Sequence, residues 1–147
     1  MKAGLLVAVV GLAMGSLCQA EDPRNVSRSD VAAIVATITS GEPVRITDGA
    51  SGFNLYGKEK SGRVGSSAGG LSISYGGETY RAARTSGGWA ISGKGFSARV
   101  ASRAGGAAIS GDASGSTGAS GTNPAVIRVD GKTLRSYQSA GDSIKLQ

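Results

Sequence analysis

An internal repeat of 18 residues constrains the fold of this chain more than any other feature. Gly-Gly pairs at 69, 87 and 105 begin stretches of similar sequence, and the same spacing extends to residues 51 and 123. The five units are 51–68, 69–86, 87–104, 105–122 and 123–140. A fixed period of this length predicts one supersecondary unit that is built several times along the chain.

Two positions within the unit carry most of the repeat signal. The fifth position is aliphatic in every unit: Leu55, Ile73, Ile91, Ile109 and Ile127. The thirteenth is arginine in all units except the fourth, which has Thr117: Arg63, Arg81, Arg99 and Arg135. Aligned glycines could arise by chance in a chain with 25 glycines, but these two further columns make the repeat specific.

Each unit is predicted to form a β-hairpin with one apolar face. The turn falls at Gly76-Gly77, Lys94-Gly95 and Asp130-Gly131, dipeptides that suit two-residue hairpin turns. Closing the hairpins there makes one face apolar: Leu71 with Ala82, Ile73 with Tyr80, Trp89 with Val100, Ile91 with Ala98, and Ile127 with Leu134. The other face is mostly polar: Ser72 with Arg81, Ser74 with Thr79, Ser92 with Ser97, and Arg128 with Thr133. Alternation within strands and agreement across turns are independent observations, so they support the same register.

The remaining segments are less regular. The fourth unit has no apolar second strand, so residues 112–121 are predicted to form a surface loop in place of a hairpin. Asp30 can cap a short helix from Val31 to about Thr39, followed by a strand over 43–47, although the β-branched residues of 31–38 also suit a strand. Residues 21–28 are expected to be an exposed tail ahead of a single β-rich domain, 29–147.

These elements predict an all-β fold with a short N-terminal helix. In the favoured arrangement the hairpins form an antiparallel meander that curls into a sandwich or a small barrel. The alternative is a β-solenoid with one repeat per coil. In a solenoid the arginines would stack about 4.8 Å apart and repel each other, whereas a meander separates them by about 9.6 Å.

The first 20 residues are typical of a cleavable export signal. Lys2 precedes a short apolar run, and Cys18-Gln19-Ala20 provides small residues for cleavage. The run is too short for a membrane span, and no second apolar segment follows. We therefore expect a periplasmic, cell-surface or extracellular protein without a membrane span. Its only cysteine, Cys18, would leave with the signal, so no disulfide is expected.

Composition excludes most catalytic chemistry. The chain has no histidine, so residues 65–69, which match the G-x-S-x-G pattern, lack the base that a serine nucleophile needs. Cysteine–histidine zinc sites and phosphate-binding loops are excluded in the same way, and we expect no cofactor, no metal and no catalytic residues. A secreted hydrolase with two carboxylates is the weakest alternative, because Asp30 suits a helix cap and Asp130 and Asp142 precede turn glycines.

The arginine column is the candidate functional feature. The chain has 16 basic and 10 acidic residues, and in the hairpin register Arg63, Arg81, Arg99 and Arg135 lie on one sheet face near Tyr56 and Arg128. Arginine forks beside an aromatic ring suit phosphate, sulfate or carboxylate groups. Candidate ligands outside the cell are anionic polysaccharide, lipopolysaccharide and extracellular DNA. The competing interpretation is a solvated face that keeps the sheet soluble.

Two functional hypotheses follow. The first is a non-enzymatic structural or interaction module at the cell envelope or outside it, whose partner is another envelope protein or a second copy that associates edge to edge. The second is a soluble polyanion-binding protein that uses the arginine row.

Overall fold

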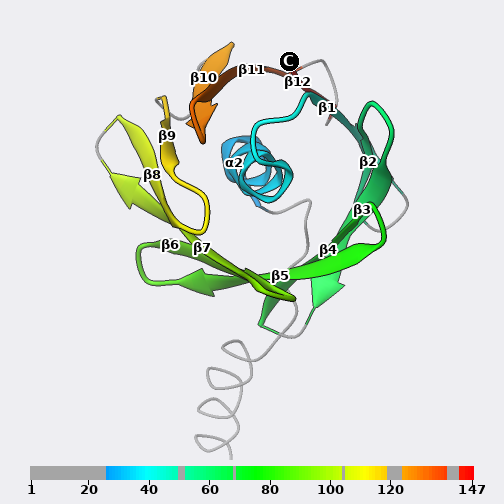
Figure 1. The fold of residues 1–147 in the computed structure, drawn as a ribbon, viewed down its shortest axis with the longest axis horizontal. Helices are drawn as coiled ribbons and strands as arrows, with labels where there is room; N and C mark the ends of the chain where they lie inside the picture. Colours follow the sequence, from blue (N-terminus) through cyan, green and yellow to red (C-terminus); the bar gives the residue numbers. More distant parts are fainter. Residues whose placement is uncertain (1–25, 50–51, 68, 104, 119–123, 139–142) are drawn as a thin grey trace, which may run out of the picture.

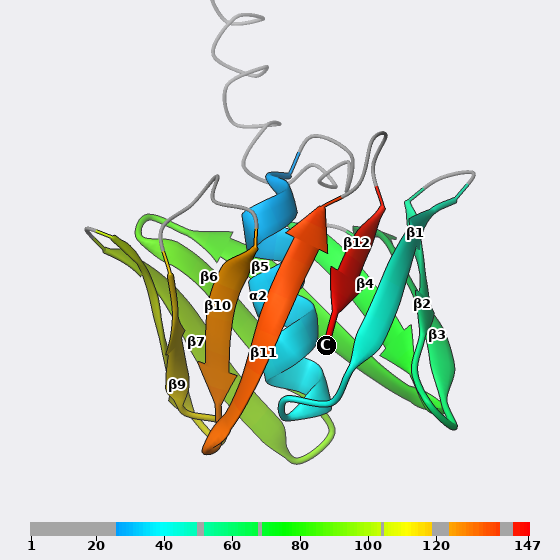
Figure 2. The same ribbon diagram turned by 90° about the horizontal axis from the view of Figure 1, so that it is seen from above.

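The chain forms a closed β-barrel of twelve antiparallel strands around one helix (Figures 1 and 2). The computed structural model describes residues 26–49, 52–67, 69–103, 105–118, 124–138 and 143–147, so the predicted export signal lies outside the described residues. The expected fold class, all-β with a short N-terminal helix, is confirmed, and of the expected arrangements it is the barrel that forms. The solenoid alternative is wrong, because each repeat contributes two antiparallel strands and not one coil.

The strands follow one another around the barrel in chain order, and β1 closes it by pairing with both β2 and β12. Their bounds are β1 Val44–Asp48, β2 Phe53–Tyr56, β3 Ser61–Ser67, β4 Gly70–Tyr75, β5 Glu78–Thr85, β6 Gly88–Gly93, β7 Phe96–Arg103, β8 Gly106–Gly111, β9 Gly115–Thr117, β10 Ala125–Val129, β11 Lys132–Gln138 and β12 Ile144–Leu146. The expected strand 43–47 is β1, displaced by one residue.

The predicted hairpin registers are confirmed. Leu71 pairs with Ala82 in β4–β5, Trp89 with Val100 in β6–β7, and Ile127 with Leu134 in β10–β11. The predicted apolar face is the inner wall of the barrel, where most of these side chains are buried. The predicted polar face is the outer wall.

The second glycine of each Gly-Gly pair allows two neighbouring strands to approach closely. A Cβ atom at Gly70 would collide with the backbone oxygen of Ala82, and one at Gly88 with that of Val100. Any side chain at these positions would therefore push the strands apart. Glycine recurs at this position of the repeat because the neighbouring strand leaves no room for a Cβ atom.

The fourth repeat corrects one prediction. Residues 112–121 were expected to form a loop; 119–121 lie outside the described residues, and Gly115–Thr117 form β9, which pairs with β8 and with β10. Ile109 pairs with Gly115 across this hairpin, which displaces the register by one residue from that of the other repeats. A displacement of one residue exchanges the two faces of a strand. Thr117 therefore pairs with the buried Ala107 and faces inward, and Ser116 faces outward.

Helix α2 (Arg28–Thr39) lies inside the barrel (Figure 2). Residues 31–39 are all buried, as expected of a helix that is surrounded by wall on every side. The predicted cap was wrong, because Ser27 caps the helix and its hydroxyl accepts a hydrogen bond from the Asp30 amide at 3.1 Å. Of the predicted exposed tail, 21–28, residues 21–25 lie outside the described residues, whereas Val26 is only 1% exposed and packs in the core, and Arg28 begins the helix.

Candidate anion-binding belt

All six residues of the predicted site lie on the outer wall. Arg63, Arg81, Arg99, Arg128 and Arg135 alternate with buried neighbours along their strands and are exposed, and Tyr56 is 45% exposed. The strand order distributes them around the whole circumference, from β2 and β3 to β10 and β11. The structure therefore does not gather them into one compact patch.

The strand registers place the repeat arginines at regular steps. Arg63 on β3 is paired with Ser74 on β4, and Ser72, two residues away on β4, is paired with Arg81 on β5. The same step leads to the next arginine, because Arg81 is paired with Ser92 on β6 and Ala90 with Arg99 on β7. Each step crosses two strands and moves two residues along one of them, about 12 Å between α-carbons.

The same steps continue around the rest of the barrel. From Arg99 the path crosses Ser110 and Ala108 on β8 and Ser116 on β9 to Arg128 on β10. Val126 on β10 is paired with Arg135, and the backbone of Arg135 exchanges hydrogen bonds with that of Gln147. The fourth repeat has Thr117 where the other repeats have arginine, and Arg128 on the adjacent strand β10 provides the cation in this part of the path.

The path closes on itself. Lys145, two residues from Gln147, is paired with Arg45 on β1, and Arg45 with Tyr56 on β2. Asn54, two residues from Tyr56, is paired with Arg63, where the path began. The two-residue moves along the even-numbered strands thus offset the stagger between paired strands. The path returns to its first residue, so these residues form a ring around the barrel at one level along its axis. We call Arg45, Arg63, Arg81, Arg99, Arg128, Arg135 and Lys145 the belt.

Sequence reasoning missed two members of the belt. Arg45 and Lys145 lie outside the 18-residue repeats, on the two strands that close the barrel. Each is an exposed cation between two buried aliphatic residues, which is the pattern of a strand with one buried face. That pattern could have predicted that both side chains face outward. Their position beside each other could not be predicted, because it depends on the pairing of β1 with β12.

Two tyrosines lie beside these cations. The Arg45 guanidinium lies over the ring of Tyr56, 5.6 Å from its centroid, a cation–π distance. Tyr137 is the register partner of Lys145 on β11 and is half-buried. A shallow depression of about 290 Å³ includes Arg45, Tyr56, Lys145 and Gln147 in its lining. An anionic group here would meet two cations and an aromatic ring.

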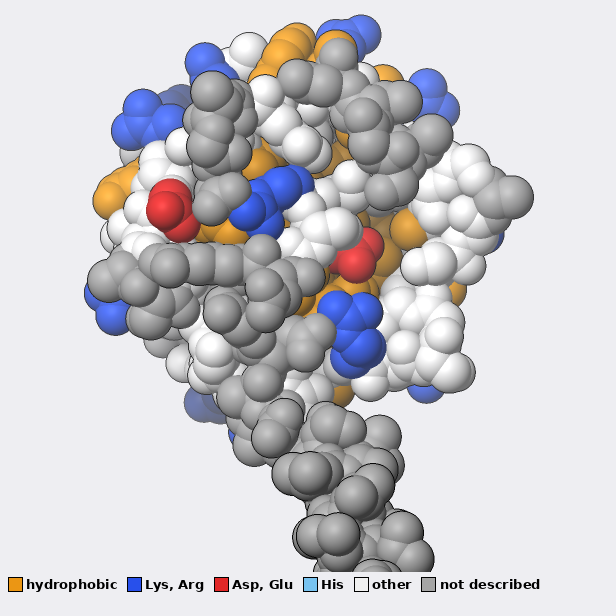
Figure 3. All heavy atoms as spheres, turned by 180° about the vertical axis from the view of Figure 1, so that it is seen from behind, with side chains coloured by type: hydrophobic (Ala, Val, Ile, Leu, Met, Phe, Trp, Pro, Cys, Tyr) orange, Lys and Arg blue, Asp and Glu red, His pale blue; other side chains and the backbone are white. Residues whose placement is uncertain are grey.

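Charge is segregated on the described surface. The only carboxylates within strands, Asp48 and Glu78, lie at strand ends and belong to the inward-facing register. The other described carboxylates lie in the helix or in the connections at the barrel ends: Asp30, Glu42, Glu59, Asp112 and Asp130. The outward strand positions therefore carry cations and no carboxylate. Figure 3, an end-on view, shows lysine and arginine side chains spaced around the outline of the molecule.

The belt arginines of the repeats have no acidic partner among the described residues. Most of their register partners are small, for example Ser72 and Ser92 beside Arg81, although Arg63 also has Asn54 and Arg135 has Val126. Small neighbours leave the planar guanidinium forks accessible, and such forks can bind oxyanions through two parallel hydrogen bonds.

Two carboxylates hold connections at the barrel end, whereas Glu42 and Glu59 line a depression of about 330 Å³ together with Lys58 and Lys60. The Asp112 carboxylate accepts a hydrogen bond from the Ser97 amide at 2.9 Å, and that of Asp130 accepts one from the Ser114 amide at 3.1 Å. Asp112, after β8, is thus tied to β7, and Asp130, after β10, is tied to the connection between β8 and β9. No group of three or more metal-ligating side chains occurs among the described residues.

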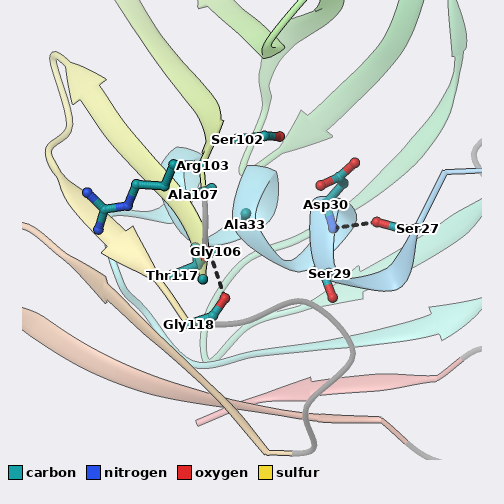
Figure 4. A pocket seen from close by; sticks show the side chains of 11 residues that line it. Ser27, Ser29, Asp30, Ala33, Ser102, Arg103, Gly106, Ala107, Thr117 and Gly118 are labelled. Carbon is teal, nitrogen blue, oxygen red and sulfur yellow. Dashed lines mark hydrogen bonds between the residues drawn. The ribbon is translucent and has the colours of Figure 1, made fainter.

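A recess of about 400 Å³ lies at the end of the barrel where α2 begins (Figure 4). It is lined by the first turn of the helix, by Arg103 on β7, and by Thr117 and Gly118. The Asp30 carboxylate and the Arg103 guanidinium point away from each other in Figure 4. The recess therefore does not combine an acid and a base at one point.

Comparisons with protein-family models, with curated proteins and with solved structures found no match to this chain. In the described part of the chain, no helix has both the length and the apolar character needed to cross a membrane.

Proposed function

We propose that this protein is a non-enzymatic module that binds polyanions through the belt and works outside the cytoplasm. The observation that carries the proposal is the closed ring of seven cations on an outer wall whose described strand positions hold no carboxylate. Six of the seven are arginine, the side chain that best matches phosphate, sulfate and carboxylate geometry. Candidate ligands are anionic polysaccharide, lipopolysaccharide and extracellular DNA, which share these groups.

The competing hypothesis of edge-to-edge self-association is less well supported. Such assembly needs an unpaired strand edge, and each of the twelve described strands pairs with a neighbour on both sides. Closure of the sheet therefore removes the template for adding a further strand. A non-enzymatic role is supported by the lack of histidine in the chain and by the Asp112 and Asp130 carboxylates, which accept backbone hydrogen bonds at the barrel end.

Retention on immobilised heparin tests the proposal. The parent protein should bind at low salt and elute as salt increases, because each anionic group that is neutralised releases counterions. The variant with Arg81→Ser and Arg99→Ser should elute at clearly lower salt and show a smaller dependence of affinity on salt. Folding should be unchanged, since both side chains are exposed.

The matched control is the variant with Lys58→Ser and Lys94→Ser. It loses the same charge, but these lysines lie in turns at the barrel end and not on the belt. If both variants elute at the same salt concentration, binding follows net charge and the belt has no specific role. If the parent protein is not retained at low salt, the arginines serve only solubility. Competition with duplex DNA and with an acidic polysaccharide separates the candidate ligands.

A further inference from the structure

The belt faces every direction around the barrel, which has a consequence for long ligands. Twelve strands at about 4.8 Å spacing and a tilt of about 40° give a barrel roughly 24 Å across between opposite backbones. From Arg63 on β3 to Arg128 on β10 is five strand-to-strand steps in one direction around the barrel and seven in the other, so they lie on nearly opposite sides. A ligand in contact with one side leaves the cations of the other side free.

A stiff polyanion cannot wrap around so small a cylinder. Duplex DNA has a persistence length of about 50 nm, which is far greater than the barrel radius. It must therefore touch the belt along a tangent, where it reaches only the cations of one side. The belt arginines of the repeats are about 12 Å apart, so one duplex contacts a few neighbouring cations and not the full ring.

We propose that one barrel binds two stiff polyphosphate duplexes at once, on opposite sides of the belt, and so crosslinks them. The inference rests on the proposed polyanion binding and adds its mode, bridging. Because each duplex makes few contacts with one barrel, a single attachment is weak. Two duplexes that are already joined by one barrel are held close together, so further barrels bridge them at a high effective concentration and the network is strong. The protein would then act on a mesh of chains and not as a coat on one chain.

Capture between two duplexes tests bridging. One duplex is immobilised on beads and a second, fluorescent duplex is added in solution with the protein. Captured fluorescence should increase with protein and then decrease when protein is in excess, because each duplex then carries its own barrels. Protein retained on the beads is measured in the same samples, so that binding and bridging are recorded separately.

Two variants of equal charge distinguish bridging from simple binding. The one-sided variant, Arg63→Ser with Arg81→Ser and Arg99→Ser, keeps belt cations only on the consecutive strands β10, β11, β12 and β1. Arg84 on β5 and Arg103 on β7 are not belt residues and are kept in both variants. The dispersed variant, Arg63→Ser with Arg99→Ser and Arg135→Ser, keeps cations on β1, β5, β10 and β12, around the whole barrel. Both should stay on the duplex beads at low salt, but only the dispersed variant should capture the second duplex.

The possible outcomes are separable. If both variants capture the second duplex equally, bridging does not depend on a belt that faces opposite directions, and the inference is wrong. If parent protein is retained on the beads but never captures the second duplex, polyanion binding stands and bridging fails. If no parent protein is retained on heparin or on duplex beads, the proposed function fails as well.

Discussion

The belt has two halves that differ in origin and in charge spacing. On β3, β5 and β7 the cations are Arg63, Arg81 and Arg99, one on every second strand. On β10, β11, β12 and β1 every strand carries a cation, and Arg45 and Lys145 are direct register partners. The first three form the spaced half, and Arg128, Arg135, Lys145 and Arg45 form the crowded half.

The comparison shows two ways of placing charge on one wall. In the spaced half, neighbouring cations are about 12 Å apart. This separation exceeds the screening length in physiological salt, about 8 Å, so these cations repel each other only weakly. In the crowded half, like charges directly opposite across two strands destabilise the sheet. Tyr56 and Tyr137 flank this pair, and no described carboxylate on the wall offsets it. The crowded half should therefore have the higher affinity for an anion.

The gap at β9, between the two halves, provides the largest expected effect. The sequence column places the missing arginine at Thr117, whereas the structure turns Thr117 toward the lumen and Ser116 toward solvent. Thr117→Arg should lower the free energy of unfolding by about 1–3 kcal/mol, because it places a charge on the inward face of β9, opposite the buried Ala107 and Ile127. Ser116→Arg should lower it by less, about 0.2–1 kcal/mol, because the new side chain faces solvent and its cost is repulsion from Arg128, its register partner. Denaturant unfolding of both variants measures this, and the opposite order would contradict the displaced register of β9.

Removing the charges of the closest pair should have the next largest effect. Arg45→Ser with Lys145→Ser should weaken polyanion binding by on the order of tenfold, and by more than Arg81→Ser with Arg99→Ser, although each variant loses two charges. Binding isotherms with one defined sulfated polysaccharide at fixed salt measure the difference. Equal losses would mean that the two halves contribute alike and that local charge density does not matter.

The smallest effect concerns the inner wall behind the spaced half. Tyr75 on β4 is buried, and its hydroxyl has no hydrogen-bond partner among the described residues. Burial, and then the charge of Glu42, raise the pKa of Tyr75 above its ordinary value of 10.0. Below pH 10 the tyrosine is neutral in both states. As the pH rises above 10, it ionises in the unfolded chain first, so the folded state loses stability.

Tyr75→Phe should remove this loss. The variant should also be up to about 1 kcal/mol more stable at neutral pH, because it no longer buries an unpartnered hydroxyl. Thermal unfolding of parent and variant between pH 8 and about pH 11 compares them in the range above the ordinary tyrosine pKa. Parallel curves for the two proteins would show that Tyr75 does not govern alkaline stability.

Much of the local structure could be predicted from the sequence, because it depends on contacts within one repeat. Leu71 meets Ala82 and Trp89 meets Val100 across turns of known type, so residue alternation and turn chemistry were sufficient. The Ser27 cap could also have been recognised, since Ser27 and Asp30 both suit an N-terminus. The register of β9 could not, because a Gly/Ser-rich strand has no apolar pattern to specify it.

The sequence alone determined the hairpins, the apolar and polar faces, and the outward direction of the repeat arginines, since each depends on neighbours along the chain. Tertiary structure decided the rest. Pairing of β1 with β12 joins segments from opposite ends of the described chain, places α2 inside the lumen, and brings Lys145 beside Arg45. The stagger accumulated over twelve strands turns a column of arginines into a closed belt, and no single repeat contains that information.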